Sequence, residues 1–379
     1  MHFTVNSKVF AHHLSVANRA VSKKSTDPLL LNVLVNAEVD GSVRLTGFNH
    51  TLSISTYFDA DISGIGAIAL SGALLFDIVY SLPDEDVSLI VDTKEDQTSL
   101  VYISCGKSKY RIPHAEALEF PSFPPLKIKS KVSVSSAQLK TALKSCLYAA
   151  SNEEAQTTLT GVRVSIGLDN LQLVALDGRR LAQVLLEVEI ENDVLSEPCE
   201  LTVPSDSLSQ LQQMLSKEPE KIEIALDTNS NLAQITGGTY QLKTRTLSGE
   251  YPKYQALIPP SFQNSLFVDR KKMLTSLERL LLVSNAKIPI LKVDIDSDQV
   301  SLSTIGDTFG SGEEVISISQ FAGEAICFNV NAKYTIEALK SMTSEEVEIS
   351  TNTPLSPIVV RPLGDLKSLS VVMPIQVKE

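Results

Sequence analysis

The chain has 379 residues, of which 43% are hydrophobic and 21% charged, and it contains 17 glycines and 17 prolines. This composition excludes a disordered or fibrous chain, and the length is too great for one ordinary hydrophobic core, so two or three domains are expected. A net charge of −12, from 33 Lys and Arg against 45 Asp and Glu, argues against a protein that binds phosphate over its whole surface.

The predicted elements begin with a short alternating strand that runs into a helix, and this pair recurs twice along the chain. In each helix the apolar residues return at helical spacing, so each buries one stripe. The period is near 130 residues, because the residues expected to cap the helices lie 129 and 134 positions apart. The strands cover residues 3–5, 132–134 and 266–268, and the capping residues are Asn6, Ser135 and Asp269.

Further strands and a second helix follow at the same period in each copy. The strands alternate apolar and polar residues, which is typical of a half-buried sheet. Strands are predicted at 43–45, 171–173 and 300–302, and second helices at 71–82, 204–218 and 331–342.

Proline-rich segments end the first two copies and are typical of linkers. Residues 119–125 and 250–260 share an acidic, an aromatic and a proline residue in the same order. The sequence therefore predicts an α+β protein of three similar domains, residues 1–127, 128–259 and 260–379, each with two helices packed on antiparallel sheets. Coincidence among common helix and strand patterns is the alternative, and five features in one register argue against it.

The first helix of each copy is basic although the chain is acidic. Residues 6–21, 135–150 and 269–284 together carry eight basic residues and two acidic ones. A surface built from such helices would face DNA or RNA phosphate, and no motif for reading bases occurs, so binding would not depend on base sequence. The alternative is that these side chains only solvate exposed helix faces. The residues expected to face DNA are Lys8, Arg19, Lys23, Lys24, Lys140, Lys144, Arg270, Lys271, Lys272, Arg279, Lys333 and Lys340.

No motif for catalysis or for binding a metal or cofactor is complete. Residues 106–108 read Gly-Lys-Ser in a strand pattern but lack the earlier glycine of a phosphate loop, and 294–298 resemble a calcium loop without its glycine and closing glutamate, so a hairpin turn is expected there. Residues 306–310 resemble a nucleophile elbow with Thr in place of Ser. The adjacent His12 and His13 cannot both reach one metal and are expected on the surface. We expect no enzyme, no metal and no cofactor.

Cysteine usage and hydropathy favour a cytoplasmic protein. The four cysteines lie far apart without a CxxC pair, which predicts neither a zinc site nor a disulfide framework. No stretch has the pattern of a membrane span, and the first residues lack the pattern of a signal peptide.

Several strings resemble the bacterial DNA sliding clamps, the beta subunit of the replicative DNA polymerase III holoenzyme. They are GKSKYRI at 106–112 with the exit EFPSFP, LQLVALDGRRLAQ at 171–183, GEYPKYQALIP at 249–259 and VVMPIQV at 371–377. The resemblance spans the whole chain. It implies a processivity factor without catalytic activity, in which two chains close head to tail into a ring of six domains with the helices inside. Duplex DNA would pass through the ring, which would tether the replicative polymerase, with the clamp loader and other clamp-binding proteins as further partners.

The resemblance also implies two protein interfaces. Tyr110, Ile112, Leu282 and Val283 would close the dimer, with core packing an equal alternative for Leu282. A cleft between domains 2 and 3 would bind partner peptides that carry hydrophobic anchors, because its Leu, Val, Pro and Met side chains adapt to varied guests and Arg lies at its rim. Without the resemblance, VVMPI would be a buried last strand. The cleft residues are Leu159, Leu176, Gly178, Arg179, Arg180, Leu181, Pro252, Leu257, Leu355, Pro357, Val371, Val372, Met373, Pro374 and Ile375.

The chain departs from the family pattern at the cleft. Leu176 stands for the usual Thr, Arg179 for the common His and Ala256 for a frequent Arg, and the ending MPIQV replaces MPMRL, with Gln376 at its fourth position. These changes bear on which peptides bind. The sequence leaves two other classes of function open. One is an enzyme with its active site between domains, and the other is a scaffold that binds only proteins.

Overall fold

Each copy starts with the strand-to-helix turn that the sequence predicts. The computed structural model describes residues 1–91, 100–128, 130–188, 198–215, 220–284, 287–305, 310–365 and 367–377. At all three turns the first helical N–H donates to the carbonyl of a glutamate, Glu85, Glu220 or Glu345, at 3.0, 2.7 and 2.9 Å. The side chains of Asn6 and Asp269 each accept a backbone N–H of the helix they precede, at 2.9 Å, which satisfies a donor that the first turn leaves unpaired.

The helices are shorter than the sequence predicts but lie where it predicts them. The end of the second helix of the middle copy, with Lys217 and the acidic residue after it, lies outside the described residues. The helices are α1 (Ser7–Ala17), α2 (Gly72–Tyr80), α3 (Ser136–Leu147), α4 (Ser205–Met214), α5 (Arg270–Leu282) and α6 (Ala332–Ser341).

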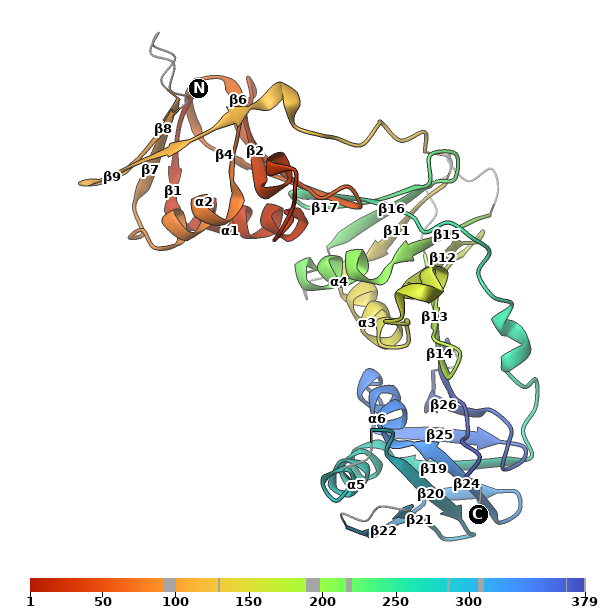
Figure 1. Ribbon diagram of the computed structural model, residues 1–379. Coiled ribbons are helices and arrows are strands. Elements are labelled where there is room, and N and C mark those ends of the chain that lie inside the picture. The colour runs from red at the N-terminus through yellow and green to blue at the C-terminus, as the bar shows by residue number, and fades with distance from the viewer. Residues whose placement is uncertain are drawn as a thin grey trace. The chain divides into compact units, whose positions relative to one another are not determined.

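By their contacts the described residues form two compact units, which are described separately. The first contains residues 1–136 and 213–246, and the second contains 137–188, 198–212 and 247–377. The middle copy is divided between them because one of its sheets continues into the first copy and the other into the third (Figure 1).

The first unit contains two antiparallel sheets. In order across the sheet, the five strands of one are β5 (Asp61–Gly64), β1 (His2–Asn6), β7 (Asp86–Val91), β8 (Leu100–Cys105) and β9 (Ser108–Pro113). The nine strands of the other are β10 (Ala115–Glu116), β6 (Gly66–Ser71), β2 (Asn32–Ala37), β3 (Ser42–Phe48), β4 (Leu52–Asp59), β18 (Tyr240–Arg245), β17 (Leu232–Gly237), β16 (Lys221–Asp227) and β11 (Ser130–Ser135).

The second unit also contains two antiparallel sheets. The strands of the larger one are β15 (Cys199–Pro204), β12 (Gly161–Ile166), β13 (Asn170–Leu176), β14 (Arg180–Glu187), β27 (Ser368–Val372), β26 (Ile358–Pro362), β25 (Glu346–Thr351), β19 (Asn264–Asp269) and β23 (Gln320–Ala322). Those of the smaller one are β22 (Glu313–Ser317), β21 (Gln299–Thr304), β20 (Ile290–Ile295) and β24 (Ile326–Asn331).

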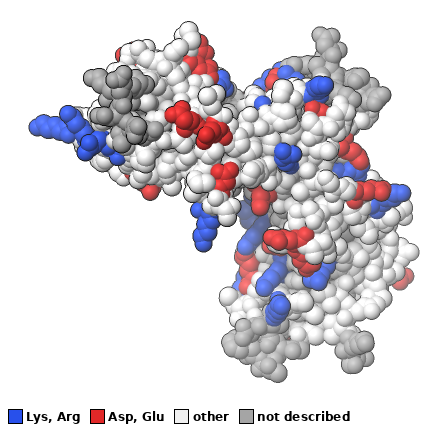
Figure 2. All heavy atoms as spheres, turned by 45° about the horizontal axis from the view of Figure 1, so that its top comes forward, with Lys and Arg blue, Asp and Glu red and all other residues white. Residues whose placement is uncertain are grey.

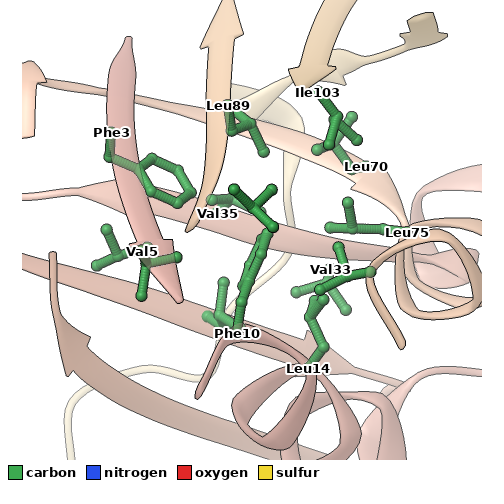
Figure 3. Close-up of a cluster of buried hydrophobic side chains, with 14 of the residues drawn as sticks. Phe3, Val5, Phe10, Leu14, Val33, Val35, Leu70, Leu75, Leu89 and Ile103 are labelled. Atoms are coloured by element: carbon green, nitrogen blue, oxygen red, sulfur yellow. The ribbon is translucent and has the colours of Figure 1, made fainter. Parts of the chain in front are cut away.

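The helices of a copy bury their apolar stripe against its two sheets. In the first copy Phe10 and Leu14 of α1 are fully buried with Phe3 of β1 and Leu89 of β7 (Figure 3). The Phe3 and Phe10 rings meet edge to face, with centroids 5.7 Å apart. Burying each such side chain stabilises the fold by about 1.5–3 kcal/mol, so the strand alternation and the helix stripe specify one core.

Two strand pairs carry a sheet from one copy into the next, and they have the same register. In the first unit Thr56 of β4 lies opposite Tyr240 of β18, and in the second Val184 of β14 lies opposite Ser368 of β27. The ladders within each copy show that Thr56 and Val184 are equivalent positions, as are Tyr240 and Ser368. The same strand register therefore joins the first copy to the second and the second to the third.

Two of three local expectations can be compared with the described residues. The acidic run at 294–298 ends β20 and then forms the predicted hairpin turn, at residues 296–298, before β21. In the Gly-Lys-Ser string at 106–108, Gly106 and Lys107 form the turn between β8 and β9 and Ser108 begins β9, and Gly106 has a φ of +52° that favours glycine there. The elbow-like string at 306–310 falls largely on 306–309, outside the described residues.

The expected surface position of the adjacent histidines is wrong for His13. Its side chain is buried on α1, with Nδ1 2.7 Å from Thr56 Oγ1 and the ring packed on Phe58, whereas His12 is exposed. Adjacent residues on a helix point about 100° apart, so one can face the core while the other faces solvent.

Candidate nucleic-acid interface and peptide-binding region

Most of the basic residues expected to face DNA are exposed on helices or on the loop after α1. Arg19, Lys140 and Arg270 are half-buried. Figure 2 shows that Lys and Arg side chains lie beside Asp and Glu on the face it presents, rather than in one uninterrupted basic patch. The exposed residues are Lys8, Lys23, Lys24, Lys144, Lys271, Lys272, Arg279, Lys333 and Lys340.

Some of these charges are already engaged inside the chain. The Arg279 guanidinium donates to both carboxylate oxygens of Glu314 at 2.7 Å, and this pairing raises the pKa of Arg279 and lowers that of Glu314. Lys340 Nζ lies 2.8 Å from a carboxylate oxygen of Glu278. A charge neutralised in this way attracts phosphate less strongly than a free ammonium does.

The Arg270 and Arg19 side chains are hydrogen-bonded within the chain. The Arg270 guanidinium donates to the carbonyls of Ser344 and Leu339, at 2.7 and 3.3 Å, where α6 ends. Basic side chains commonly satisfy the last carbonyls of a helix. Arg19 donates to the side-chain oxygen of Gln213 at 2.5 Å. Neither guanidinium is fully available to a phosphate.

The remaining lysines are the stronger candidates for DNA contacts. They are exposed and form no ion pair with any residue of the described ranges. An unpaired ammonium on a flexible stem can meet successive phosphates without fixing a register. They are Lys8, Lys23, Lys24, Lys144, Lys271, Lys272 and Lys333.

The structure brings part of the predicted peptide-binding set into one apolar cluster. Leu176, Leu181 and Val371 are buried together with two tyrosines that the sequence analysis did not assign, Tyr251 and Tyr254. Leu159 packs against this cluster from a half-buried position. Burial raises the pKa of Tyr251 above its ordinary range, and its hydroxyl donates to the carbonyl of Val174 at 3.2 Å.

The other residues of the set lie outside this cluster and differ in exposure. Leu257 is 36% exposed and Leu355 56% exposed, so both have apolar surface free to contact another molecule. Pro252, Gly178 and Arg179 are exposed, and Pro357, Met373, Pro374 and Ile375 are half-buried. Val372 is buried.

Arg180 is not at a rim, contrary to the sequence interpretation. Its side chain is buried and packs over the rings of Tyr334 and Tyr148, 4.5 and 5.5 Å from their centroids. It donates to Asp177 at 3.0 Å and also to Glu337. A buried guanidinium needs such partners to offset its lost hydration, so Arg180 braces α3, α6 and the turn before β14.

Arg179, one residue earlier, is exposed and hydrogen bonds to Tyr334, which raises the pKa of its guanidinium. The turn that presents it needs Gly178, whose φ is +81°. Asp177 accepts the N–H groups of both arginines, at 2.9 and 3.0 Å. The Asp-Gly turn signal can be read in the sequence. The contacts with Tyr334 and Glu337 cannot, because these residues lie more than 150 positions away.

Residues 373–375 connect the turn before β14 with strand β24 through backbone hydrogen bonds. The N–H of Met373 donates to the carbonyl of Arg179 at 2.9 Å, and that of Ile375 to the carbonyl of Asn329 in β24 at 2.8 Å. The string VVMPI is therefore a buried strand end at Val371 and Val372, followed by a backbone-anchored tail.

The residues expected to close a dimer are unequally available. Ile112 is buried in the core of the first copy, with 5% of its surface exposed. Tyr110 is 39% exposed on β9, and Val283 is half-buried. Leu282 is 79% exposed, so the alternative that it packs in the core is wrong.

No group of three His, Cys, Asp or Glu side chains that could hold a metal occurs among the described residues. Burial raises the pKa of the Cys146 thiol, and that of Cys327 to about 11, which keeps both thiols in the less nucleophilic protonated form. Within the described ranges no helix is long and apolar enough to cross a membrane.

Comparisons with known proteins agree over the whole length. Three family profiles match: the N-terminal domain of the DNA polymerase III beta subunit over residues 1–124, its central domain over 133–253 and its C-terminal domain over 255–376. The beta sliding clamp of Synechocystis sp. is 33% identical over 376 residues, and that of Synechococcus elongatus 34% identical over 372, each alignment covering 96% of both chains.

Solved structures show the same fold. The DNA polymerase sliding clamp from Bacillus subtilis superposes with a TM-score of 0.93 at 24% identity, covering 100% of both chains. A sliding clamp from Bartonella birtlesii, bound to griselimycin, gives a TM-score of 0.90 at 27% identity and the same coverage.

Proposed function

Because the chain belongs to the DNA polymerase III beta subunit family, the beta sliding clamps, and is thus a non-catalytic processivity factor, we propose how it performs that role. Two copies close head to tail into a ring that encircles duplex DNA without sequence specificity. The residues around the Leu176–Val371 cluster form the cleft that binds peptides of the replicative polymerase, the clamp loader and other replication or repair proteins.

Ring closure is supported by the strands that lack a partner. Successive copies are joined by pairing β4 with β18 and β14 with β27 in one register. The next strands in this series are β22 and β9, and each is an edge strand of its sheet among the described residues. Exposed edges tend to pair, so β22 of one copy and β9 of a second would complete the series twice and close the ring. This observation carries the proposal.

DNA binding by such a ring needs only weak contacts. The exposed lysines on α1, α3, α5 and α6 would meet phosphates through their flexible stems, and none of them reads base edges. Closure retains the DNA, and weak contacts leave the ring free to slide while it keeps a bound polymerase near the primer end.

The peptide cleft is supported by apolar surface beside a braced turn. Leu257 and Leu355 are partly exposed, and each lies three or four residues along the chain from a member of the buried apolar cluster, Tyr254 or Val359; Arg179 offers a donor fork at solvent. Such a surface suits a short peptide with two or three hydrophobic anchors and an acidic or polar end. Leu176 and Arg179 stand where relatives commonly carry Thr and His, so this chain's peptide preference would be more apolar and more acidic.

Retention on DNA tests the encircling mechanism. The clamp is loaded by its clamp loader and ATP onto nicked circular duplex, and the bound fraction is followed after the circle is cut at one site. A ring stays on the circle and slides off the cut ends, whereas an ordinary DNA-binding protein is retained equally on both. Equal retention, or no loading at all, would overturn the proposal in favour of a scaffold that binds only proteins.

A further inference from the structure

The first junction, between the first and second copies, repeats the backbone of the peptide cleft proposed at the second junction, between the second and third. Asn49 accepts the N–H groups of Thr51 and Leu52, at 3.2 and 2.8 Å, in the same turn that precedes β14 at the second junction. His50 takes the positive φ, here +69°, of the glycine in that turn. The N–H of Arg245 donates to the carbonyl of Thr51 at 2.8 Å, which repeats the backbone bond that anchors the chain end. All these residues belong to the first unit.

An apolar cluster lies at the first junction as well. It combines a strand end with the linker that leaves the first copy, as the cluster of the second junction does. Phe48 is the last residue of β3, as Leu176 is of β13, and Phe120 and Phe123 precede their counterparts Tyr251 and Tyr254 by 131 positions. The first-junction cluster consists of buried Leu30, Phe48, Phe123 and Leu232 with half-buried Phe120 and Leu126 packed against them.

One row of residues across the sheet differs in chemistry between the two junctions. Residues directly opposite each other on neighbouring strands face the same side of the sheet. At the second junction the row is Leu176, Leu181, Val371 and Val359, all within the apolar cluster. At the first junction the row is Phe48, Ser53, Lys243 and Gln234. A lysine therefore stands beside the first-junction cluster where the peptide cleft has a valine.

Lys243 is a half-buried cation without an opposite charge in the described ranges. It forms no ion pair with a described residue, and burial lowers the pKa of its ammonium. Arg245 lies two residues further along β18, on the same face of the strand, and is exposed. Its guanidinium lies 5.4 Å from the centroid of the Phe123 ring, and its Nε donates to the carbonyl of His50 at 3.1 Å.

The charge at this surface is opposite to that of the chain as a whole. Neither the row nor the first-junction cluster contains an acidic residue, whereas the chain has a net charge of −12. Two cations beside an apolar cluster complement a peptide that carries carboxylates next to an apolar side chain. A partly buried ammonium gains more from such a carboxylate than a surface lysine does, because it has already lost part of its hydration.

We propose that the first junction is a second peptide-binding site, which takes an acidic segment of another protein with an apolar anchor. The anchor rests on the half-buried Phe120 and Leu126, and the flanking carboxylates pair with Lys243 and Arg245. The inference rests on the proposed peptide cleft, whose backbone this junction repeats, but assigns different residues and a different peptide chemistry. Two sites of different chemistry allow one chain to hold two partners at once.

Fluorescence anisotropy of the full chain with a fluorescein-labelled peptide, Gly-Asp-Leu-Asp-Phe-Asp-Gly, tests the site. The same peptide with Asn in place of every Asp should bind about tenfold more weakly or worse. Lys243→Met keeps the length of the side chain without its charge; it should weaken binding of the acidic peptide about tenfold and leave the thermal transition of the parent unchanged. Lys253→Met, at an exposed position of the second linker, is the matched control and should bind like the parent.

Truncation before Met373 separates this site from the proposed peptide cleft. The truncated chain should bind the acidic peptide like the parent while it loses a clamp-binding peptide. No binding of the acidic peptide at up to about 1 mM, equal binding to Lys243→Met, or loss of its binding on truncation would each overturn this inference. A single-stranded oligonucleotide that binds in place of the peptide and is lost in Lys243→Met would also overturn it, in favour of nucleic acid. A truncated chain that still binds the clamp-binding peptide contradicts the proposed cleft instead.

Discussion

Acid should destabilise the first copy through His13, and glutamine at this position should remove the effect. The imidazole is 8% exposed on α1, packed against Phe58 and hydrogen-bonded to Thr56 Oγ1 at 2.7 Å. Burial, with repulsion from His12 as the smaller cause, lowers the pKa of His13 from 6.5 to about 4. The folded state therefore holds a neutral ring over a range in which the unfolded chain takes up a proton.

The sign and size follow from proton linkage. Above pH 6.5 the ring is neutral in both states, and His13 adds no pH dependence. As the pH falls from 6.5 to 4, only the unfolded state gains the proton, so the free energy of unfolding decreases, and below 4 both states are protonated and the loss stops. In total the free energy of unfolding decreases by about 3 kcal/mol, and about 2 kcal/mol of this decrease falls between pH 7 and pH 5.

Amide hydrogen exchange of residues 7–17 gives a local measure that does not need the whole chain to unfold as one unit. From pH 7 to pH 5, after correction for intrinsic exchange, the opening free energy of α1 should fall by about 2 kcal/mol more in the parent than in His13→Gln. His12→Gln, which changes the exposed neighbour, should keep most of the parent's loss. Equal losses in the parent and His13→Gln would refute the assigned pKa shift.

Three further results are expected. Arg180→Met should lower the free energy of unfolding by about 2–4 kcal/mol in denaturant titrations, because it leaves the Asp177 carboxylate partly buried without its guanidinium; a change below about 0.5 kcal/mol would contradict the brace. Charge reversal at Lys144 and Lys272 should flatten the dependence of DNA binding on salt with the dimer intact, and an unchanged slope would exclude these residues from the DNA surface. Truncation before Met373 should abolish binding of a clamp-binding peptide in fluorescence anisotropy while leaving the dimer; surviving binding would place the cleft elsewhere.

The repeated architecture was predictable because its signals are local. A capping side chain, an apolar stripe and an alternating strand each lie within a dozen residues, and the strand-to-helix starts at Asn6, Ser135 and Asp269 are found where these signals place them. Helix lengths were overestimated, since apolar residues continue past the point where α1 passes into the 3-10 turn Asn18–Ala20.

The roles of single residues were less predictable because they depend on distant neighbours. His13 is buried by β4, more than 40 positions away, and Arg180 is held by α6, more than 150 away. Ile112 reads as an ordinary strand residue, and only the pairing of β9 on β8 shows that its side chain faces the core. A one-residue change of register would have exposed it.

The repeat also explains how the segment after the last strand of each copy is anchored. After its last strand, each copy returns to the free edge of its other sheet. Ala115 pairs with Ala69 of β6, the N–H of Leu247 donates to the carbonyl of Thr202 in β15, and that of Ile375 donates to Asn329 in β24. In the first two copies the returning segment leads on as a linker. In the third the same anchored backbone carries Met373 and Pro374, both half-buried, which belong to the proposed peptide cleft.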